Sequence, residues 1–302
     1  MAAEKVKINS IKAWFLAARP KTLTGAAVPV MIALALAYRD IGAEKFLFVP
    51  AFLCVLFAFI MQIDANFIND YFDFLRGNDN EMRLGPRRAC AQGWISQVYM
   101  RRAIGVVTLL GCLCGLPLVL FGGLQMLLVG VLCVCFCFLY TTWLSYKALG
   151  DLLVLVFFGI VPVCVTYFLQ VYDVGKDVFC ASLACGFVID TLLIVNNYRD
   201  IDNDRRTGKD TLIVKLGAEK GRKAYLISGV LGVVLGPVVV INSWCVVVGV
   251  SLIYLLIHVL TYRRMIKIGS GKALNIILGE TARNMFFYGL LMVAGILLDI
   301  YL

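Results

Sequence analysis

The chain has 302 residues, of which 61% are hydrophobic, and its mean hydropathy is +0.89. Soluble globular domains contain a much smaller share of hydrophobic residues, so this composition argues against a soluble protein. The formal net charge of +9 would suit a nucleic-acid partner. The placement of the charged residues along the chain explains this net charge without a nucleic-acid partner.

Nine apolar segments follow one another, each about 20 residues long, which is the length that crosses a bilayer. In chain order they cover about 22–38, 46–68, 103–122, 124–143, 151–170, 178–197, 224–241, 243–262 and 284–301. The first follows a basic amphipathic stretch, Lys5 to Lys21, and no small-residue cleavage pattern comes after it, so we expect no removed signal peptide. The sequence predicts an all-α polytopic membrane protein with nine transmembrane helices, as a single domain over residues 1–302.

The basic residues gather on one side of the predicted membrane. With the N-terminus inside, the inner segments hold 25 of the 28 Lys and Arg residues, and only Arg39, Lys45 and Lys176 fall outside. Inner loops of membrane proteins carry such an excess of positive charge. We therefore expect a multi-pass protein of the cell inner (cytoplasmic) membrane with its N-terminus in the cytoplasm.

Two acidic motifs nearly repeat each other at the ends of apolar segments. Asn69–Asp73 (NDYFD) ends the second segment and Asn196–Asp200 (NNYRD) ends the sixth, and each continues into a polar loop with Gly-x-Asp. Carboxylates at the ends of hydrophobic helices are costly, so they mark a functional site by default. The repeat predicts two related halves, about 1–145 and 146–302, with both motifs on the cytoplasmic side.

Helical spacing places the polar residues of each motif on one face. The first face carries Gln62, Asn66, Asn69, Asp70 and Asp73, and the second carries Asn196, Asp200 and Asp204. Carboxylates brought together by two such faces would repel each other, and a divalent cation removes that repulsion. Asp190 shares a face with Asn197 and is a candidate for lining a cavity, whereas Asp64 points away from the stripe and is expected to have a structural partner.

The donor set indicates Mg²⁺ as the metal. The eleven cysteines form no CxxC pair and mostly lie inside apolar segments, and the single histidine, His258, lies within the eighth. Oxygen donors without His or Cys are typical of Mg²⁺, which often bridges to phosphate. The loops beside the motifs offer basic partners for phosphate: Arg76, Arg83, Arg87, Arg88, Arg199, Arg205, Arg206 and Lys209. With an apolar groove beside them, these groups suit a polyprenyl diphosphate.

At these residues the chain resembles the UbiA superfamily of intramembrane prenyltransferases, which have nine transmembrane helices and two Asp-rich motifs that bind Mg²⁺-diphosphate. Asn69 and Asp73 match N-x-x-x-D of the first motif, and Asp200 and Asp204 match D-x-x-x-D of the second. Gly77 stands where the first motif usually has a third carboxylate, and Asp79 follows two residues later.

Further elements are similar to the branch that prenylates 1,4-dihydroxy-2-naphthoate in menaquinone synthesis. They are Arg19–Thr22 (RPKT), Arg83–Pro86 (RLGP) with Gln92-Gly93, Leu149–Asp151 (LGD), and the run from Asn196 through Asp204 to Gly208–Leu212. This resemblance implies transfer of a polyprenyl group from polyprenyl diphosphate to 1,4-dihydroxy-2-naphthoate, with loss of CO₂ and diphosphate, to give demethylmenaquinone. Prenyl chain length and oligomeric state stay open.

The resemblance also implies roles for single residues. Metal ligands are expected at Asp70, Asp73, Asp79, Asp200 and Asp204, and catalytic roles at Asp70, Asp73, Asp200, Asp204, Tyr140 and Lys147. Substrate-binding residues are expected at Lys21, Asn66, Asn69, Arg83, Asn196, Asn197, Arg199 and Lys209. Topology alone accounts for many of the basic residues, and helix-end polar residues can satisfy local backbone groups. The doubled motif favours function over these explanations.

Three other functions are weighed against this one. A UbiA-type enzyme for another aromatic acceptor, such as 4-hydroxybenzoate or homogentisate, is disfavoured by Gly77 and by the RLGP and NNYRD elements. An ion-coupled transporter would place its carboxylates near the bilayer midplane, whereas these lie at segment ends beside basic loops. A purely structural membrane protein gives no reason for two matching acidic stripes.

Overall fold

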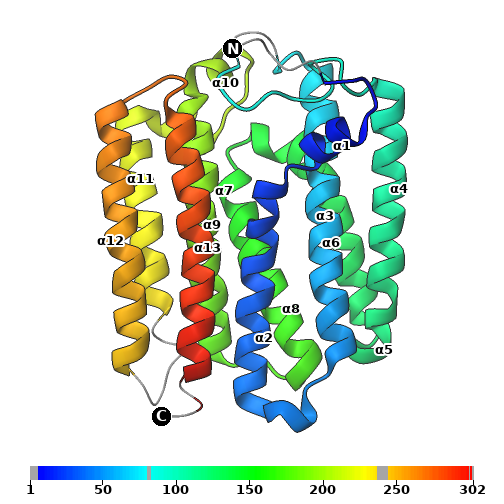
Figure 1. The fold of residues 1–302 in the computed structure, drawn as a ribbon, viewed down its shortest axis with the longest axis vertical. Helices are drawn as coiled ribbons and strands as arrows, with labels where there is room; N and C mark the ends of the chain where they lie inside the picture. The colour runs from blue at the N-terminus through cyan, green and yellow to red at the C-terminus, as the bar shows by residue number, and fades with distance from the viewer. Residues whose placement is uncertain (1–5, 80–82, 237–243, 299, 301–302) are drawn as a thin grey trace.

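The apolar segments fold into long helices that run alongside one another in one bundle (Figure 1). The computed structural model describes residues 6–79, 83–236, 244–298 and 300, with the backbone alone for 244–250. The longer helices are α2 (Leu23–Lys45), α3 (Phe48–Leu75), α4 (Gln97–Gly115), α6 (Gln125–Thr142), α8 (Val161–Val171), α9 (Lys176–Arg199), α11 (Leu212–Leu235), α12 (Trp244–Ile268) and α13 (Leu274–Leu298).

Short helical elements complete the chain between these helices. They are α1 (Ile11–Ala18), η1 (Pro20–Thr22), η2 (Leu116–Leu118), α5 (Val119–Gly122), η3 (Leu144–Tyr146), α7 (Gly150–Val154), the π-helical turn η4 (Leu155–Ile160) and α10 (Ile201–Arg206). The π-helical turn comes just before Pro162, which has no backbone N–H to give to the carbonyl of Phe158. That carbonyl instead lies 3.9 Å from the thiol of Cys185 on α9.

Seven helical stretches among the described residues are long and apolar enough to cross a membrane. They are Ile11–Lys45, Phe48–Leu75, Gln97–Gly122, Gln125–Thr142, Gly150–Val171, Lys176–Arg199 and Leu274–Leu298. Each contains or overlaps one predicted segment, while α11 and α12 cover the other two. The first half of α11 and the end of α12 carry several charged residues, so the parts of these helices whose side chains are described do not contain an uncharged stretch of the required length. The chain is an all-helical, multi-pass membrane protein.

The predicted boundaries differ from the observed ones mainly where polar residues lie inside a helix. The last helix begins at Leu274 rather than at 284. Its first turns carry Glu280, which pairs with Arg264 of α12, and Asn284, whose amide donates to the Thr261 hydroxyl at 2.9 Å. These partners on α12 let α13 start before its apolar run does.

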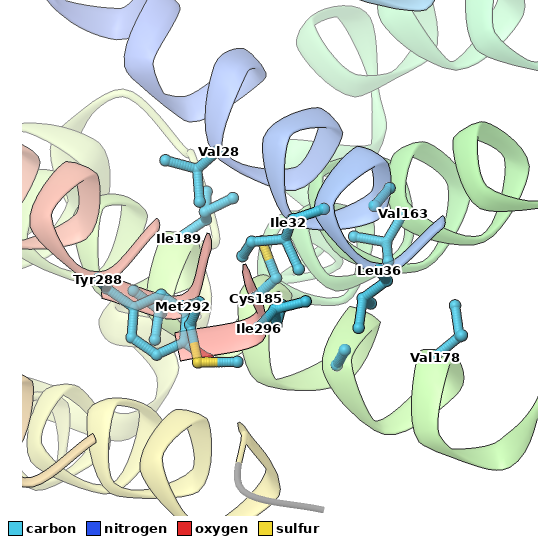
Figure 2. Packing of buried hydrophobic residues seen from close by; sticks show 14 of the residues in the cluster. Val28, Ile32, Leu36, Val163, Val178, Cys185, Ile189, Tyr288, Met292 and Ile296 are labelled. Atoms are coloured by element: carbon cyan, nitrogen blue, oxygen red, sulfur yellow. The ribbon is translucent and has the colours of Figure 1, made fainter. Parts of the chain in front are cut away.

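A buried core lies between α2, α9 and α13 in the middle of the bundle. Figure 2 shows Ile32 and Leu36 of α2 beside Cys185 of α9 and Met292 and Ile296 of α13. The outer faces of α4 and α6, by contrast, expose large apolar side chains such as Leu109, Leu113 and Leu128. Apolar surface of this extent needs a partner, and for long apolar helices that partner is lipid.

Candidate active site

The two acidic motifs lie at the same end of the bundle, where α10 and the loop after α3 come together near α1 (Figure 1). α3 carries the first motif to its end. α9 ends at Arg199, so the second motif continues through Asp200 into the short helix α10 rather than along one helix. The two loops meet where the Asn203 amide donates to the carbonyl of Asn78 at 3.5 Å.

Both motifs end their helices with the same turn. Gly77 and Gly208 each have a φ of +70°, a conformation that favours glycine. The next residue donates back to the carbonyl of an aspartate, Asn78 N to Asp73 O at 3.0 Å and Lys209 N to Asp204 O at 2.8 Å. This is the Schellman ending of a helix. By these turns, Asp73 and Asp204 hold equivalent positions in the two motifs, whereas the sequence pattern aligned Asp73 with Asp200. Gly77 stands where the family's first motif usually has a carboxylate, because the turn needs a positive φ there.

Four carboxylates gather around these turns, those of Asp73, Asp79, Asp200 and Asp204, and all are buried. Burial raises the pKa of Asp79 to about 7, and the charges of Asp73 and Asp70 act in the same direction. Burial also raises the pKa of Asp204 to about 6, with Asp200 and Asp73 adding to it. The repulsion expected between the two motifs is therefore present in the folded protein.

Three basic side chains face this acidic cluster. The Arg83 guanidinium donates to the Asp79 carboxylate. The Arg88 guanidinium lies 3.8 Å from both the Asp73 and the Asp79 carboxylates. Burial acts to lower the pKa of Lys209, but the carboxylates of Asp73 and Asp204 outweigh it and raise that pKa above its ordinary value. Acidic and basic groups thus share one small region, which suits a metal ion together with an anion.

Some polar atoms of this region lack hydrogen-bond partners. One oxygen of Asp79 and two guanidinium nitrogens of Arg88 are buried without a hydrogen bond among the described residues. Within that part of the chain, no three carboxylates, thiols or imidazoles converge closely enough to enclose a metal by themselves. Mg²⁺ usually takes one or two carboxylates and fills its remaining positions with water and phosphate oxygens.

Tyr146 connects the two motif loops from the side. Arg76 stacks over its ring at 4.4 Å, Lys209 lies over the same ring at 5.8 Å, and the Asn78 amide donates to its hydroxyl. Next to it, Lys147 pairs with Asp210 through a single parallel bridge of the backbone. The turn after α6 thereby fixes the position of Lys209.

Arg199 is occupied by protein groups. Its guanidinium donates to the Asp200 carboxylate, to the Asn196 amide oxygen at 2.8 Å and to the Asn275 amide oxygen at 2.9 Å. Asn275 in turn donates to the carbonyl of Leu84 at 2.7 Å, so the RLGP loop is joined to α9 and α13. Arg199 was predicted to contact diphosphate, and in the structure its guanidinium faces Asp200, Asn196 and Asn275.

Asp70 is likewise engaged by the protein. Its two carboxylate oxygens accept hydrogen bonds from the backbone N–H groups of Ala89 and Cys90, at 2.8 and 3.0 Å. Asp70 therefore holds the loop that carries Arg83 and Arg88. Asp70 was predicted to be a metal ligand, and in the structure each of its carboxylate oxygens accepts one backbone N–H of this loop.

The predicted amide residues of α3 also bind neighbouring helices. Asn66 donates to the carbonyl of Ala18 and to the Thr22 hydroxyl, both at 2.9 Å, and Asn69 accepts from the Thr141 hydroxyl at 2.7 Å. They align α3 with the α1–α2 connection and with α6. Asp64, expected to be structural, accepts from the Thr108 hydroxyl of α4 at 2.6 Å.

The remaining predicted residues divide into two groups. Tyr140, Asn197 and Lys209 line one small cavity, together with Ser145, Gly150, Asp151, Thr211 and Leu212. The side chains of Lys21 and Lys147 are exposed, and no described contact brings either to the acidic cluster. The sequence named Arg88 only as one of several basic candidates and did not name Tyr146. One loop holds several arginines and an interfacial tyrosine is common, so nothing in the pattern says which of them turns inward.

Comparison with known proteins identifies the family. A model of the UbiA prenyltransferase family matches residues 26–297. The 1,4-dihydroxy-2-naphthoate octaprenyltransferase of Haemophilus influenzae is 34% identical over 75% of this chain and 76% of its own length, and that of Escherichia coli is 35% identical over 72% and 73%.

The fold is also found among solved structures. A UbiA homolog from Archaeoglobus fulgidus bound to GPP and Mg²⁺ has a TM-score of 0.66 at 15% identity, over 96% of this chain and all of its own. The apo UbiA homolog from Aeropyrum pernix has the same TM-score at 16% identity, over 91% of this chain and 97% of its own. The chain belongs to the UbiA prenyltransferase family.

Proposed function

We propose that this protein transfers a polyprenyl group from a polyprenyl diphosphate to 1,4-dihydroxy-2-naphthoate, with loss of CO₂ and diphosphate, and so forms the hydroquinone of demethylmenaquinone. The observation that carries the proposal is the cluster in which Asp73 and Asp79 of one motif meet Asp204 of the other beside Arg83, Arg88 and Lys209. This arrangement suits a diphosphate bound with Mg²⁺. The relatives' shared name supports the naphthoate acceptor.

The metal is assigned to the four buried carboxylates that gather around the two motif turns. Among Asp73, Asp79, Asp200 and Asp204, one or two carboxylates at a time would hold an Mg²⁺ ion, with water and phosphate oxygens in its remaining positions. Asp70 holds the loop, and Arg199 holds Asp200. When bound, Mg²⁺ neutralises charge on the diphosphate and so helps it to leave. Arg88 and Lys209 donate to diphosphate oxygens. Arg83, which pairs with Asp79, donates to the diphosphate with its remaining N–H groups.

The chain's own helices supply the rest of the catalytic environment. The apolar faces of the bundle hold the prenyl chain and keep water away from the allylic carbon once charge develops there. Tyr140 and Asn197, which line the cavity with Lys209, orient the acceptor ring toward that carbon. Lys147 and Lys21, both exposed, draw the anionic substrates toward the site.

The membrane arrangement follows from the same assignment. One prenyltransferase domain of two related halves crosses the membrane nine times, and α11 and α12 supply the two crossings beyond the seven apolar stretches. The N-terminus and both motifs face the cytoplasm, because nearly all Lys and Arg residues lie at that end. The domain lies in the cell inner membrane, where the polyprenyl diphosphate reaches the site through the bilayer and the naphthoate reaches it from the cytoplasm.

The deciding experiment is a membrane assay with 1,4-dihydroxy-2-naphthoate and a labelled polyprenyl diphosphate, with Mg²⁺ and then with EDTA. We expect a prenylated, decarboxylated product that EDTA abolishes, and near-complete loss of product in Asp73→Ala. Arg205→Ala, which removes an exposed arginine of α10, is the control and should keep most of the activity. Prenylation of 4-hydroxybenzoate in place of the naphthoate would overturn the acceptor, and inactivity with every aromatic acceptor would overturn the enzyme.

A further inference from the structure

Asp151 and Asp190 form a buried carboxyl pair that the proposed metal site does not use. Asp151 lies in the first turn of α7 and Asp190 in α9, and they are 7% and 5% exposed. The two carboxyl groups are close enough for the charge of Asp151 to act on Asp190. The Ser228 hydroxyl donates to Asp190 at 3.3 Å, and the other three carboxyl oxygens have no donor among the described residues.

Such a pair is stable when it holds one proton between its two groups. Two ionised carboxylates in contact repel each other, and a shared proton removes that repulsion. A buried ion with no basic partner is also costly, whereas a pair with a single negative charge and an internal hydrogen bond reduces that cost. The pair can therefore release a proton or take up a second one without a large rearrangement.

The pair lies beside the cavity at the motif end of the bundle. Asp151 lines this cavity, as do Lys209, Tyr140 and Asn197. Tyr140 is within electrostatic reach of Asp151 and Asp190 and also of Asp73 and Asp204. One member of the unused carboxyl pair, Asp151, therefore lies in the same cavity lining as Lys209 of the proposed diphosphate site.

We propose that the Asp151–Asp190 pair binds the acceptor hydroxyl next to the reacting ring carbon and takes up its proton as the new carbon–carbon bond forms. This inference rests on the proposed function. The ring carbon that bears the carboxylate attacks C1 of the prenyl group, and the C1–O bond breaks with its electron pair leaving on diphosphate. The hydroxyl proton passes to the carboxyl pair, so that the hydroxyl oxygen becomes a ketone.

The same proton is needed again at the end of the reaction. The attacked carbon now carries both the prenyl group and a carboxylate β to the ketone. The carbon–carboxylate bond breaks, CO₂ leaves, and the electron pair forms an enolate. The carboxyl pair returns its proton to the enolate oxygen and restores the aromatic hydroquinone. A buried pair that holds the proton between the two steps suits this cycle, because no exchange with water is needed.

The test compares Asp151→Asn and Asp190→Asn with Asp64→Asn. Asp64 is the matched control, since it is a fully buried carboxylate with one hydroxyl partner, on α3 and outside the cavity lining. We expect kcat for transfer to the naphthoate to fall about 100-fold or more in the two pair variants, as after loss of a general base. Asp64→Asn should keep most of the wild-type rate.

A second acceptor separates proton transfer from a merely structural role. A naphthoate whose hydroxyl is acidic enough to be ionised at the assay pH needs no base, so the two pair variants should recover most of the wild-type rate with it. Equal losses with both acceptors, or naphthoate transfer like that of Asp64→Asn, would overturn the proposal.

Folding and the proposed function are checked separately. Mg²⁺-dependent binding of a prenyl thiolodiphosphate shows that a variant is folded. If neither pair variant binds it, the wild-type protein is tested with a modified acceptor. Methylation of the naphthoate hydroxyl next to the reacting ring carbon must then abolish transfer. Continued transfer would overturn the proposal. If the wild type does not prenylate dihydroxynaphthoate but does prenylate another phenol, the proposed acceptor fails while the pair is tested on that phenol.

Discussion

Arg199 shows how a single residue can matter to the site without touching a ligand. Its planar guanidinium holds Asp200, Asn196 and Asn275 at once, and it is fully buried. Lysine has one ammonium group on a flexible stem and cannot hold three acceptors in a plane. We expect Arg199→Lys to weaken Mg²⁺-dependent binding of a prenyl diphosphate by about 10- to 100-fold, as when an outer-shell partner of a metal ligand is removed.

The matched control is Arg205→Lys, since Arg205 makes a solvent-exposed pair with Asp202 on α10. Calorimetric titration of each variant in detergent measures the affinity. If Arg199→Lys bound as tightly as Arg205→Lys, Arg199 would not position Asp200 for the metal.

At the scale of helices, one close approach sets how the π-helical turn packs on α9. A Cβ added at Gly159 would meet the Ser182 carbonyl oxygen at 2.6 Å and the Gly186 Cα at 2.8 Å, and both are backbone atoms. Small residues allow this approach between helices in membranes. Overpacking of a tight contact costs about 1–3 kcal/mol, so Gly159→Val should lower the unfolding temperature clearly.

Gly130 of α6 gives the comparison, because a Cβ there would meet nothing within 4 Å. Thermal unfolding of Gly159→Val and Gly130→Val in the same detergent measures the difference. Similar unfolding temperatures for both variants would mean that α9 and the π-helical turn can separate without cost.

The elements also mark how far the sequence alone could go. Long apolar segments located the helices, and the two acidic motifs marked the ends of α3 and α9, because both signals are local. It could not show that the helix breaks at Asp200, that the loop backbone occupies Asp70, or that Arg88 rather than Arg87 reaches the carboxylates. Those outcomes depend on contacts between distant segments. The sequence pattern likewise aligned Asp73 with Asp200, whereas the helix-ending turns align it with Asp204.

For the whole molecule, charge asymmetry predicts the orientation in the membrane. The turn between α12 and α13, at Gly269–Gly271, lies at the basic end, and the turn between α8 and α9, at Tyr172–Gly175, lies at the other end. We expect a protease tag inserted after Asp173 to be cut from outside intact cells. A tag inserted after Ser270 should be cut only after lysis. The reverse pattern would place the motifs outside the cell and overturn the cytoplasmic assignment.

Ligand binding should stabilise the whole bundle, because the site joins segments from both halves of the chain. The cluster draws on the end of α3, the loop after it and α10, so a bound ligand holds these segments together only in the native state. Binding to the native state alone stabilises a protein by about 2.7 kcal/mol at a ligand concentration of 100 times Kd.

We expect Mg²⁺ and a prenyl thiolodiphosphate together to raise the unfolding temperature more than the sum of their separate effects, since each provides ligands for the other. Asp73→Asn should remove the joint effect and Asp64→Asn should retain it. A joint effect that survived in Asp73→Asn would mean that the diphosphate binds elsewhere in the bundle.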